Sequence, residues 1–451
     1  MSNTENRKKM DFTSGPIMKG LLVFSVPLFL NNVFQNFYNI VDSLIVGIYQ
    51  SKEALAAIGA STAITNVVLG FFTGLSAGST IMIASNYGSR KEKELKESIM
   101  SAIVYSLAIG LMFTIVGVLL SKRLLMLTTC PDDILEQATL YLAVFFLGSI
   151  FTALYNACST ILLAVGDSKT PFKYLVIASF MKTGLVMLLV AVMKTGVLGA
   201  ALSTVLAQGV SGIMIFIYLT RIDEEYRIDI HQMRNINFPM MKKMLVLALP
   251  VAFQQVIVRL SFLIPQHYVN SFGTDAIAGI SVGQKIYNLA MIPASVINVV
   301  TTTFVSQNMA IENKKRTLKG MGYSAIISFS AAVVMVALIY GFAPNLVRLF
   351  NNDPGVLGYG VKMIRTVCPF LIVMAIYDVF SGSLKGFGMT KTVLWSTVIT
   401  VVIIPIIYLL FVMNRFGNIE FIYWYYPLAW TLYFMILLVI FINTVNNKIR
   451  Y

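Results

Sequence analysis

The chain has 451 residues, of which 57% are hydrophobic and only 12% are charged. A soluble globular protein carries about 25% charged residues, and a mean hydropathy of +0.78 likewise excludes an ordinary soluble domain. The formal net charge of +14 could indicate nucleic-acid binding, but the basic residues concentrate in alternate loops between apolar runs. The positive-inside rule of membrane proteins explains that pattern better, so we expect no nucleic-acid partner.

Twelve apolar segments follow one another along the chain, and each is longer than the roughly 20 residues that a helix needs to cross a bilayer. They are expected at 19–49, 54–87, 95–121, 134–165, 171–193, 195–221, 241–271, 275–310, 317–342, 354–387, 391–414 and 419–444. The period-2 alternation of barrel strands is missing, and a helix satisfies its backbone polar groups internally in lipid. The sequence therefore predicts an all-α polytopic membrane protein.

The loops between these segments alternate in charge. Basic residues cluster at 7–9, 90–93, 221–243 and 314–316, whereas the intervening loops, such as 132–133 and 351–353, are acidic or nearly neutral. This alternation places both termini and the central loop in the cytoplasm. No small-residue cleavage pattern follows the basic N-terminus, so we expect the first span to be retained.

An internal repeat divides the chain into two halves. "KEALAAIGAS" resembles "TDAIAGISVG", which pairs Ala54 with Ala276, and the same offset of 222 residues pairs Ala164 with Gly386. Six helices separate the copies, so both halves run in the same direction through the membrane as parallel repeats. The expected domains are an N-terminal segment 1–18, a lobe 19–221, a linker 222–240, a second lobe 241–444 and a tail 445–451.

The first helix contains one acid, Asp42, in the otherwise uncharged stretch "YNIVDSLIVG". A charged side chain at membrane depth costs several kcal/mol, so such a residue indicates a functional site. A rise of about 1.5 Å per residue from Lys19 puts Asp42 in the outer half of the span. Two interpretations follow: an ion-binding site, which we favour, or an acid that reaches water at the outer interface.

The fifth helix contains Lys182 between two uncharged runs. A lysine at this depth either pairs with an acid or faces water in a cavity. One hypothesis makes Lys182 the counter-ion of Asp42, which belongs to the same six-helix half. The alternative is a solvated cavity lysine that repels or selects substrates.

The second half has ionisable residues of its own. Arg259, Lys285 and Arg365 lie in predicted helices, as does Asp378. Asp378 occupies the repeat position of Asn156, so the halves differ where chemistry is expected. Asp378 is interpreted either as a second protonatable site or as a structural partner of Lys285 or Arg365, and the structural role is slightly favoured.

Several motifs resemble the MATE family of multidrug and toxin extrusion proteins, and its DinF-like prokaryotic branch in particular. They include "VPLFLNNVFQNFYNIVDSLIVG", "GLSAGSTIMIASNYGSRKEKELK" and "VNSFGTDAIAG". The resemblance covers nearly the whole chain and implies twelve transmembrane helices in two six-helix bundles. It also implies a bacterial cell-membrane antiporter, functional as a monomer and without a cofactor. Its expected activity is alternating-access export of amphipathic, often cationic, small molecules in exchange for protons or sodium.

The resemblance also implies roles for individual residues. Asp42 matches the coupling-ion acid of that branch, Tyr38 the tyrosine one turn earlier, and Pro27 the proline at which the first helix bends. Positions that face the central cavity in the family are matched by Asn156, Ser159 and Thr204. The fifth helix departs from the pattern, because Lys182 and Val186 stand where the family has an Asn and an Asp.

Other functions have weaker support in the sequence. A lipid-linked-oligosaccharide flippase of the same superfamily remains an alternative, because such proteins carry additional cations, here Lys182, Arg259, Lys285 and Arg365. A passive channel is less favoured because Asp42 in a repeated bundle indicates coupling. An enzyme is not expected, since the chain has two histidines and no convergent catalytic set, and the three cysteines have no metal-binding spacing.

Overall fold

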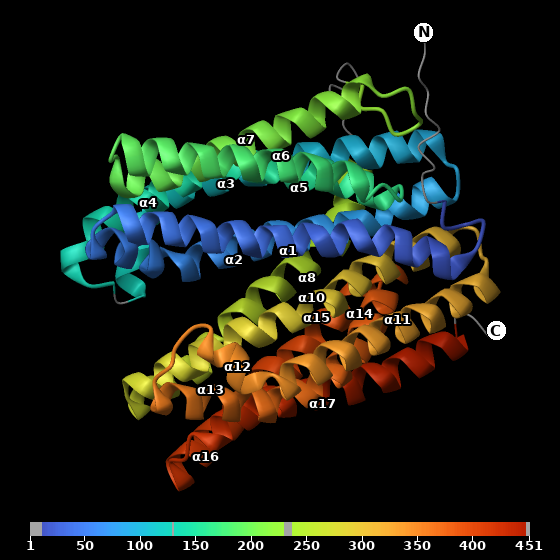
Figure 1. The fold of residues 1–451 in the computed structure, drawn as a ribbon. Helices are drawn as coiled ribbons and strands as arrows, with labels where there is room; N and C mark the ends of the chain where they lie inside the picture. Colours follow the sequence, from blue (N-terminus) through green and yellow to red (C-terminus); the bar gives the residue numbers. More distant parts are fainter. Residues whose placement is uncertain (1–10, 129, 230–236, 448–451) are drawn as a thin grey trace. The chain divides into compact units, whose positions relative to one another are not determined.

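The computed structural model describes residues 11–128, 130–229 and 237–447, and within the first helix it leaves the side chains of residues 38–40, 42 and 43 undescribed. The described residues form α-helices with short π and 3-10 segments, and no strand occurs among them (Figure 1). This confirms the all-α prediction.

The first half contains seven α-helices and one π-helix. They are α1 (Ile17–Tyr49), α2 (Lys52–Gly88), α3 (Glu92–Leu127), α4 (Asp132–Leu147), α5 (Ser149–Ala164), α6 (Lys169–Val186), the π-helix Met187–Val192 and α7 (Gly196–Arg221). α4 and α5 form one span that bends by 42°. The bend falls at Gly148, where a Cβ atom would lie 2.5 Å from Val205 Cγ2, so only glycine allows α7 to approach this closely.

The second half contains ten α-helices. They are α8 (Phe238–Ser261), α9 (Leu263–Val269), α10 (Thr274–Ala310), α11 (Lys314–Gly341), α12 (Ala343–Arg348), α13 (Pro354–Val367), α14 (Leu371–Gly386), α15 (Thr390–Thr397), α16 (Ile404–Phe416) and α17 (Glu420–Val445). A π-helix, Val398–Ile403, joins α15 to α16, and 3-10 turns lie at Asn270–Phe272 and Cys368–Phe370. Eleven helical segments of the described chain could span a membrane, and the bent α4–α5 pair makes twelve. The predicted number of spans is confirmed.

The helices form two compact units. Unit 1 contains Val26–Ala252, and unit 2 contains Phe12–Ser25 together with Phe253–Tyr451. The predicted lobes 19–221 and 241–444 remain a prediction, but the units show that the first turns of α1 pack with the second half and the first turns of α8 with the first half.

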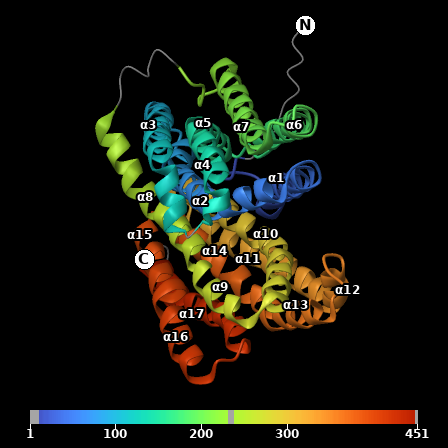
Figure 2. The ribbon, with the colours of Figure 1, turned by 90° about the vertical axis from the view of Figure 1, so that its left-hand side faces the viewer.

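Unit 1 is built around α2, which packs on α3, α4 and α5 (Figure 2). Its apolar core includes Phe72, Leu125, Leu142 and Phe146, all buried. α7 packs on α5 and α6 and completes the unit.

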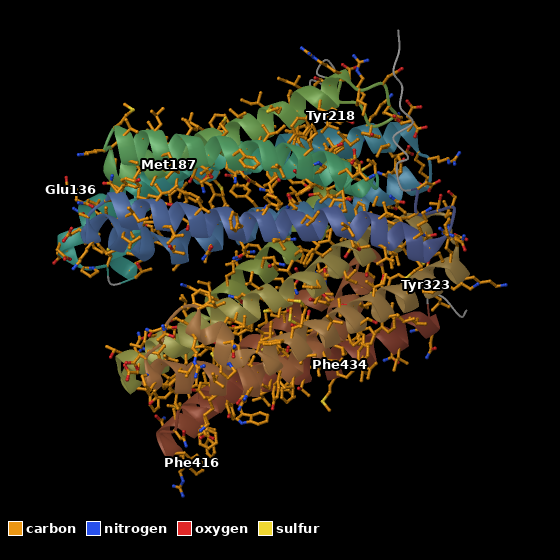
Figure 3. The ribbon with its side chains drawn as sticks, viewed as in Figure 1. Glu136, Met187, Tyr218, Tyr323, Phe416 and Phe434 are labelled. Carbon is orange, nitrogen blue, oxygen red and sulfur yellow. The ribbon has the colours of Figure 1, made fainter. Side chains whose placement is uncertain are left out.

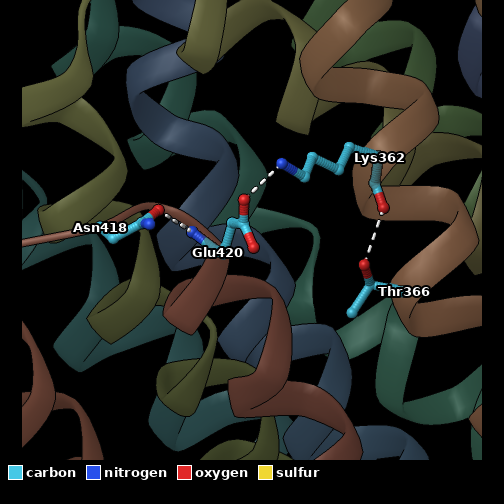
Figure 4. A network of polar contacts seen from close by, with 4 residues as sticks. All are labelled: Lys362, Thr366, Asn418 and Glu420. Atoms are coloured by element: carbon cyan, nitrogen blue, oxygen red, sulfur yellow. Dashed lines mark hydrogen bonds and ion pairs between the residues drawn. The ribbon is translucent and has the colours of Figure 1, made fainter.

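Unit 2 has α10 at its centre, in contact with α11, α13 and α14. At its surface, an ion pair between Lys362 and Glu420 connects α13 to α17, and the Asn418 side chain accepts a hydrogen bond from the Glu420 amide at 3.0 Å (Figure 4). Both charged side chains are about half exposed, and exposed pairs of this kind contribute roughly 0–1 kcal/mol. We therefore assign this network no functional role.

Apolar side chains cover the outer faces of the helices (Figure 3). Leu119 on α3, Ile407 on α16 and Phe416 at the end of α16 are all largely exposed. Such a surface suits contact with lipid chains rather than with water.

Gly382 on α14 gives a test of this packing, because a Cβ atom there would lie 2.5 Å from the Asn298 carbonyl oxygen of α10. We expect Gly382→Ala to destabilise the protein by about 1–3 kcal/mol through overpacking. The matched control is Gly322→Ala on α11, where a Cβ atom meets nothing within 4 Å and where alanine is favoured by up to about 1 kcal/mol. Thermal unfolding in detergent measures both, and equal melting temperatures would contradict the close α10–α14 contact.

Candidate functional site

A polar cavity of about 30 Å³ lies inside unit 1 between α5, α6 and α7. That volume holds about two water molecules. Its lining combines a cation, hydroxyls and an amide with a few apolar groups: Tyr155, Leu175, Ala178, Ser179, Lys182, Thr204, Ala207, Gln208 and Ser211. Two of the residues predicted from the sequence, Lys182 and Thr204, therefore lie together in one cavity.

Lys182 is the charged residue of this lining, and only 8% of its surface is exposed. The hydroxyls of Ser179 and Thr204 donate to carbonyls of their own helices, Leu175 at 2.8 Å and Ala200 at 3.2 Å. Because their protons are used in this way, their oxygens can act only as acceptors toward the cavity. These acceptor oxygens complement the Lys182 ammonium, which can only donate.

The C-terminal part of α1 packs against the end of α6 that contributes Lys182 to this cavity. Ile45 and Val46 form a buried apolar cluster with Val186, Val190 and Ala200, and Val41 packs against it. Val186 lies one turn after Lys182, so this part of α1 is next to the Lys182 end of α6.

The side chains of Asp42 and Tyr38 lie outside the described part of the structure, although both residues belong to α1. Their assignment to the site, and the pairing of Asp42 with Lys182, therefore remain predictions.

The π-helix Met187–Val192 follows the cavity helix directly. Its carbonyls have partners outside the helix: Gln50 donates to the Val190 oxygen at 2.8 Å and Thr195 to the Leu189 oxygen at 2.7 Å. π-Helical turns occur often at functional sites. The uniformly apolar stretch "MLLVAV" contains no signal that predicts it.

α5 contributes Tyr155 to the cavity rather than the two residues predicted from the resemblance. The Asn156 amide donates to the Thr152 carbonyl at 2.8 Å, and Ser159 is buried. Neither belongs to the lining of this cavity. The repeat could have indicated Tyr155, because the offset of 222 pairs it with Tyr377, but Gln208 and Ser211 are ordinary polar residues in an apolar run.

In unit 2, Asp378 lies at one end of a ladder of hydrogen bonds between α10 and α14. Asn298 donates to the Asp378 carbonyl at 2.8 Å and to its carboxylate at 3.2 Å. One and two turns further on, Thr302 donates to the Gly382 carbonyl at 3.1 Å and Ser306 to the Gly386 carbonyl at 3.4 Å. Small residues on α14 permit this close, polar helix contact.

Lys385, which is buried on α14, interacts electrostatically with Asp378. The two cations considered as partners of Asp378 lie elsewhere. Lys285 Nζ is 5.9 Å from the Phe350 ring centroid and Arg365 Cζ is 5.9 Å from that of Tyr340, and both cations are exposed. Among the described residues, the Asp378 carboxylate therefore accepts a hydrogen bond from Asn298 and lies within electrostatic reach of Lys385, whereas Lys285 and Arg365 contact aromatic rings instead, so the interpretation that paired Asp378 with one of them is wrong.

Arg259 on α8 is only partly exposed, and its Nε atom has no hydrogen-bond partner among the described residues. Five residues earlier on the same helix, Gln254 donates to Thr397 at 2.9 Å and to the Tyr433 hydroxyl at 3.3 Å. The Tyr433 ring is 4.9 Å from that of Tyr377, the neighbour of Asp378. The sequence does not single out the contacts between Gln254, Thr397, Tyr433 and Tyr377, since all four are neutral residues within apolar segments.

Comparison with known proteins identifies the fold. A family model described as MatE matches residues 27–190 and 250–410, which together make up more than half of the chain. The probable multidrug resistance protein YpnP of Bacillus subtilis is 28% identical over 393 residues, covering 86% of this chain and 86% of that protein.

Solved structures of MATE and MOP superfamily transporters superpose on nearly the whole chain. An outward-facing multidrug resistance MATE family transporter of the MOP superfamily superposes with a TM-score of 0.90 at 20% identity, covering 98% of this chain and 99% of that chain. A MOP superfamily transporter from Pyrococcus furiosus superposes with a TM-score of 0.91 at 20% identity, covering 98% of each chain. These structures therefore have the same fold as this chain.

The polar ladder of unit 2 can be tested at Asn298. Asn298→Ala removes both hydrogen bonds to Asp378, and we expect a loss of about 1–3 kcal/mol in the free energy of unfolding. Ser295→Ala on the same helix is the control, because its hydroxyl donates to the Ile292 carbonyl of α10 itself and to no other helix of the described chain. A melting temperature of Asn298→Ala equal to that of Ser295→Ala would exclude a stabilising role for the Asn298–Asp378 contact.

Proposed function

Because the chain belongs to the MatE family of membrane transporters, we propose that it is a secondary-active efflux antiporter. It exports amphipathic, often cationic, small organic compounds from the cytoplasm in exchange for protons or sodium. The match of the family model to both halves carries this proposal. Two parallel repeats support alternating access, in which a central substrate site opens to one side of the membrane and then to the other.

The charge pattern of the loops supports a cell-membrane location with both termini in the cytoplasm. Bacillus subtilis, the source of one relative, is a bacterium, which agrees with a bacterial cell membrane. Both repeats belong to one chain, and a single copy can therefore supply the complete transport path. We propose that the monomer is functional and that the coupling ion is transported rather than held as a cofactor.

Asp42 is our choice for the coupling residue. The α1 turns that follow it pack against Val186 and Val190, next to the cavity that Lys182 and Thr204 line. This cavity has room for about two water molecules, so Lys182 can be hydrated there. We propose that Lys182 balances the charge of Asp42 and that arrival of a proton or substrate breaks the pair.

Asp378 has a different environment. Asn298 orients its carboxylate and Lys385 balances its charge within the same unit. Removing one member of such a hydrogen-bonded contact leaves the other without its partner, which is destabilising. We therefore propose that Asp378 stabilises unit 2 and that ion coupling depends mainly on Asp42.

A lipid-linked-oligosaccharide flippase is the alternative function. The lipid-linked substrate of such a flippase has a large anionic headgroup, and binding this headgroup requires several cations close together in the cavity. Within unit 2, however, Lys285 on α10 and Arg365 on α13 are exposed, and each lies beside a different aromatic ring, Phe350 and Tyr340 respectively, so they do not form such a cluster. This placement favours the efflux antiporter.

Asp42→Asn tests the coupling site. Purified protein in liposomes should drive ethidium against its gradient when a proton or sodium gradient is imposed, and Asp42→Asn should lower that flux at least tenfold. Asp133→Asn, in an exposed turn at the start of α4, is the control and should behave like the wild type. Equal gradient-driven flux in Asp42→Asn and wild type would remove Asp42 from the mechanism, and gradient-independent flux in the wild type would indicate a channel.

Lys182→Met tests the proposed pair. Without a neighbouring positive charge, proton binding by Asp42 becomes easier, so the pH of half-maximal transport should rise by about one unit or more. Lys169→Met, at the exposed start of the same helix, should leave the profile unchanged. An unaltered profile in Lys182→Met would exclude Lys182 as the counter-ion.

A further inference from the structure

The chain passes between the two units inside two helices. α1 leaves unit 2 after Ser25, and α8 leaves unit 1 after Ala252. Pro27 and Pro250 lie within two residues of these points, and both are inside their helices. A proline removes one backbone hydrogen bond and weakens the helix locally, so both connections are points where a helix can bend.

The loop between α7 and α8, whose middle lies outside the described residues, is attached to unit 1 at both described ends. Tyr226 is buried, and its ring centroid is 6.4 Å from that of Tyr87. The Asn237 amide donates to the Glu97 carboxylate at 2.7 Å. Both described ends of the loop therefore belong with unit 1. If these ends acted as the hinge between the units, those contacts would be lost.

The first turns of α8 are packed into unit 1 as closely as helices allow. Ala248 and Ala252 are fully buried. A Cβ atom at Gly78 of α2 would lie 2.2 Å from Ala248 Cα, and one at Gly74 would lie 2.5 Å from Ala252 Cα. This contact fixes the part of α8 that precedes the second connection.

The residues that precede α1 are held by unit 2 in a comparable way. Arg316 donates from Nε to the Phe12 carbonyl and from Nη1 to the Gly15 carbonyl, each at 2.8 Å, and from Nη2 to the Ser14 carbonyl. One guanidinium group therefore binds three carbonyls of residues 12–15. Arg316 lies in the first turn of α11, in the loop region that the charge pattern places in the cytoplasm.

Two buried amides complete this contact. Asn308 donates to the Phe12 carbonyl at 3.0 Å, and Gln307 accepts from the Phe12 amide at 3.3 Å. Both amide side chains belong to residues of α10 that are 0% exposed. We call Arg316, Asn308 and Gln307 the N-terminal clasp.

The side chain of Phe12 adds an apolar anchor to the clasp. It is 2% exposed, and its ring lies 5.2 Å from that of Phe24 on α1 and 5.5 Å from that of Phe304 on α10. Edge-to-face aromatic pairs contribute about 0.5–1.5 kcal/mol each beyond the area they bury. Polar and apolar contacts thus hold the same short segment.

We propose that the N-terminal clasp fixes the start of α1 to unit 2, so that rearrangement of the units during transport bends α1 at Pro27. Arg316 is then a positioning residue, because it acts on the helix that carries Asp42 without contacting substrate or ion. Loss of the clasp lets the start of α1 move independently of unit 2 and alters the populations of the transport states. This inference rests on the alternating access proposed above, but its test requires no substrate.

Hydrogen–deuterium exchange of the purified full chain tests the clasp itself. In Arg316→Ala, amides of residues 12–25 should exchange at least tenfold faster than in the wild type. Arg316→Lys keeps the charge but cannot bind three carbonyls, so it should also accelerate exchange and serves if the alanine variant fails to fold. Lys315→Ala, at the exposed neighbouring position, is the matched control. Unchanged exchange in both Arg316 variants would overturn the proposal.

Spin-label distances test the consequence for the units. Labels at Lys93→Cys in unit 1 and Lys319→Cys in unit 2, both exposed positions, are placed in a Cys130→Ser, Cys158→Ala, Cys368→Ala background. The Arg316 variants should change the relative populations in the distance distribution at least twofold, whereas Lys315→Ala should not. Faster exchange with an unchanged distribution would show a purely structural contact and overturn the proposal. A failure of ethidium transport in wild-type liposomes would count against the antiporter and leave both measurements interpretable.

Discussion

In the hydrocarbon core, every backbone polar group must find its partner inside the protein. The α10–α14 contact shows how this constraint shapes the fold. Asn298, Thr302 and Ser306 point their donors at three carbonyls of α14 spaced one turn apart. The contact needs small residues on α14, and Gly382 provides one of them. Asp378 is therefore embedded in the helix packing of unit 2, whereas Lys182 lines a cavity with room for water.

The sequence predicts those parts of the structure that involve a large free energy of transfer between water and the membrane. Twelve apolar runs give twelve spans, since length and hydropathy alone decide whether a helix can cross a bilayer. A lysine at membrane depth is costly enough to stand out, and Lys182 does lie in a polar cavity together with Thr204. Tyr155 could also have been recognised, because the repeat preserves a tyrosine at that position.

Other features depend on contacts between distant residues, which a single sequence does not reveal. The sequence misassigns the partners of Asp378 because Lys285 and Arg365 are conspicuous charges, whereas Asn298 is a neutral residue in an apolar run. The two π-helices have no compositional signal in their apolar stretches. Hydropathy likewise does not predict the passage of α1 from one unit to the other, because an apolar helix has the same hydropathy whichever unit it packs against.

Because α1 passes from unit 2 into unit 1, this helix connects the two units directly. One continuous helix starts on unit 2, where Arg316 and Phe12 hold the segment before it, and continues into unit 1, where Asp42 follows. A helix transmits displacement along its axis but bends where a hydrogen bond is missing, as at Pro27. In the mechanism that we propose, a change of charge at Asp42 and a movement of unit 2 therefore act on the same helix from opposite sides of one proline. Ion binding and the rearrangement of the units then become coupled through the backbone of α1, without a chain of side-chain contacts between them.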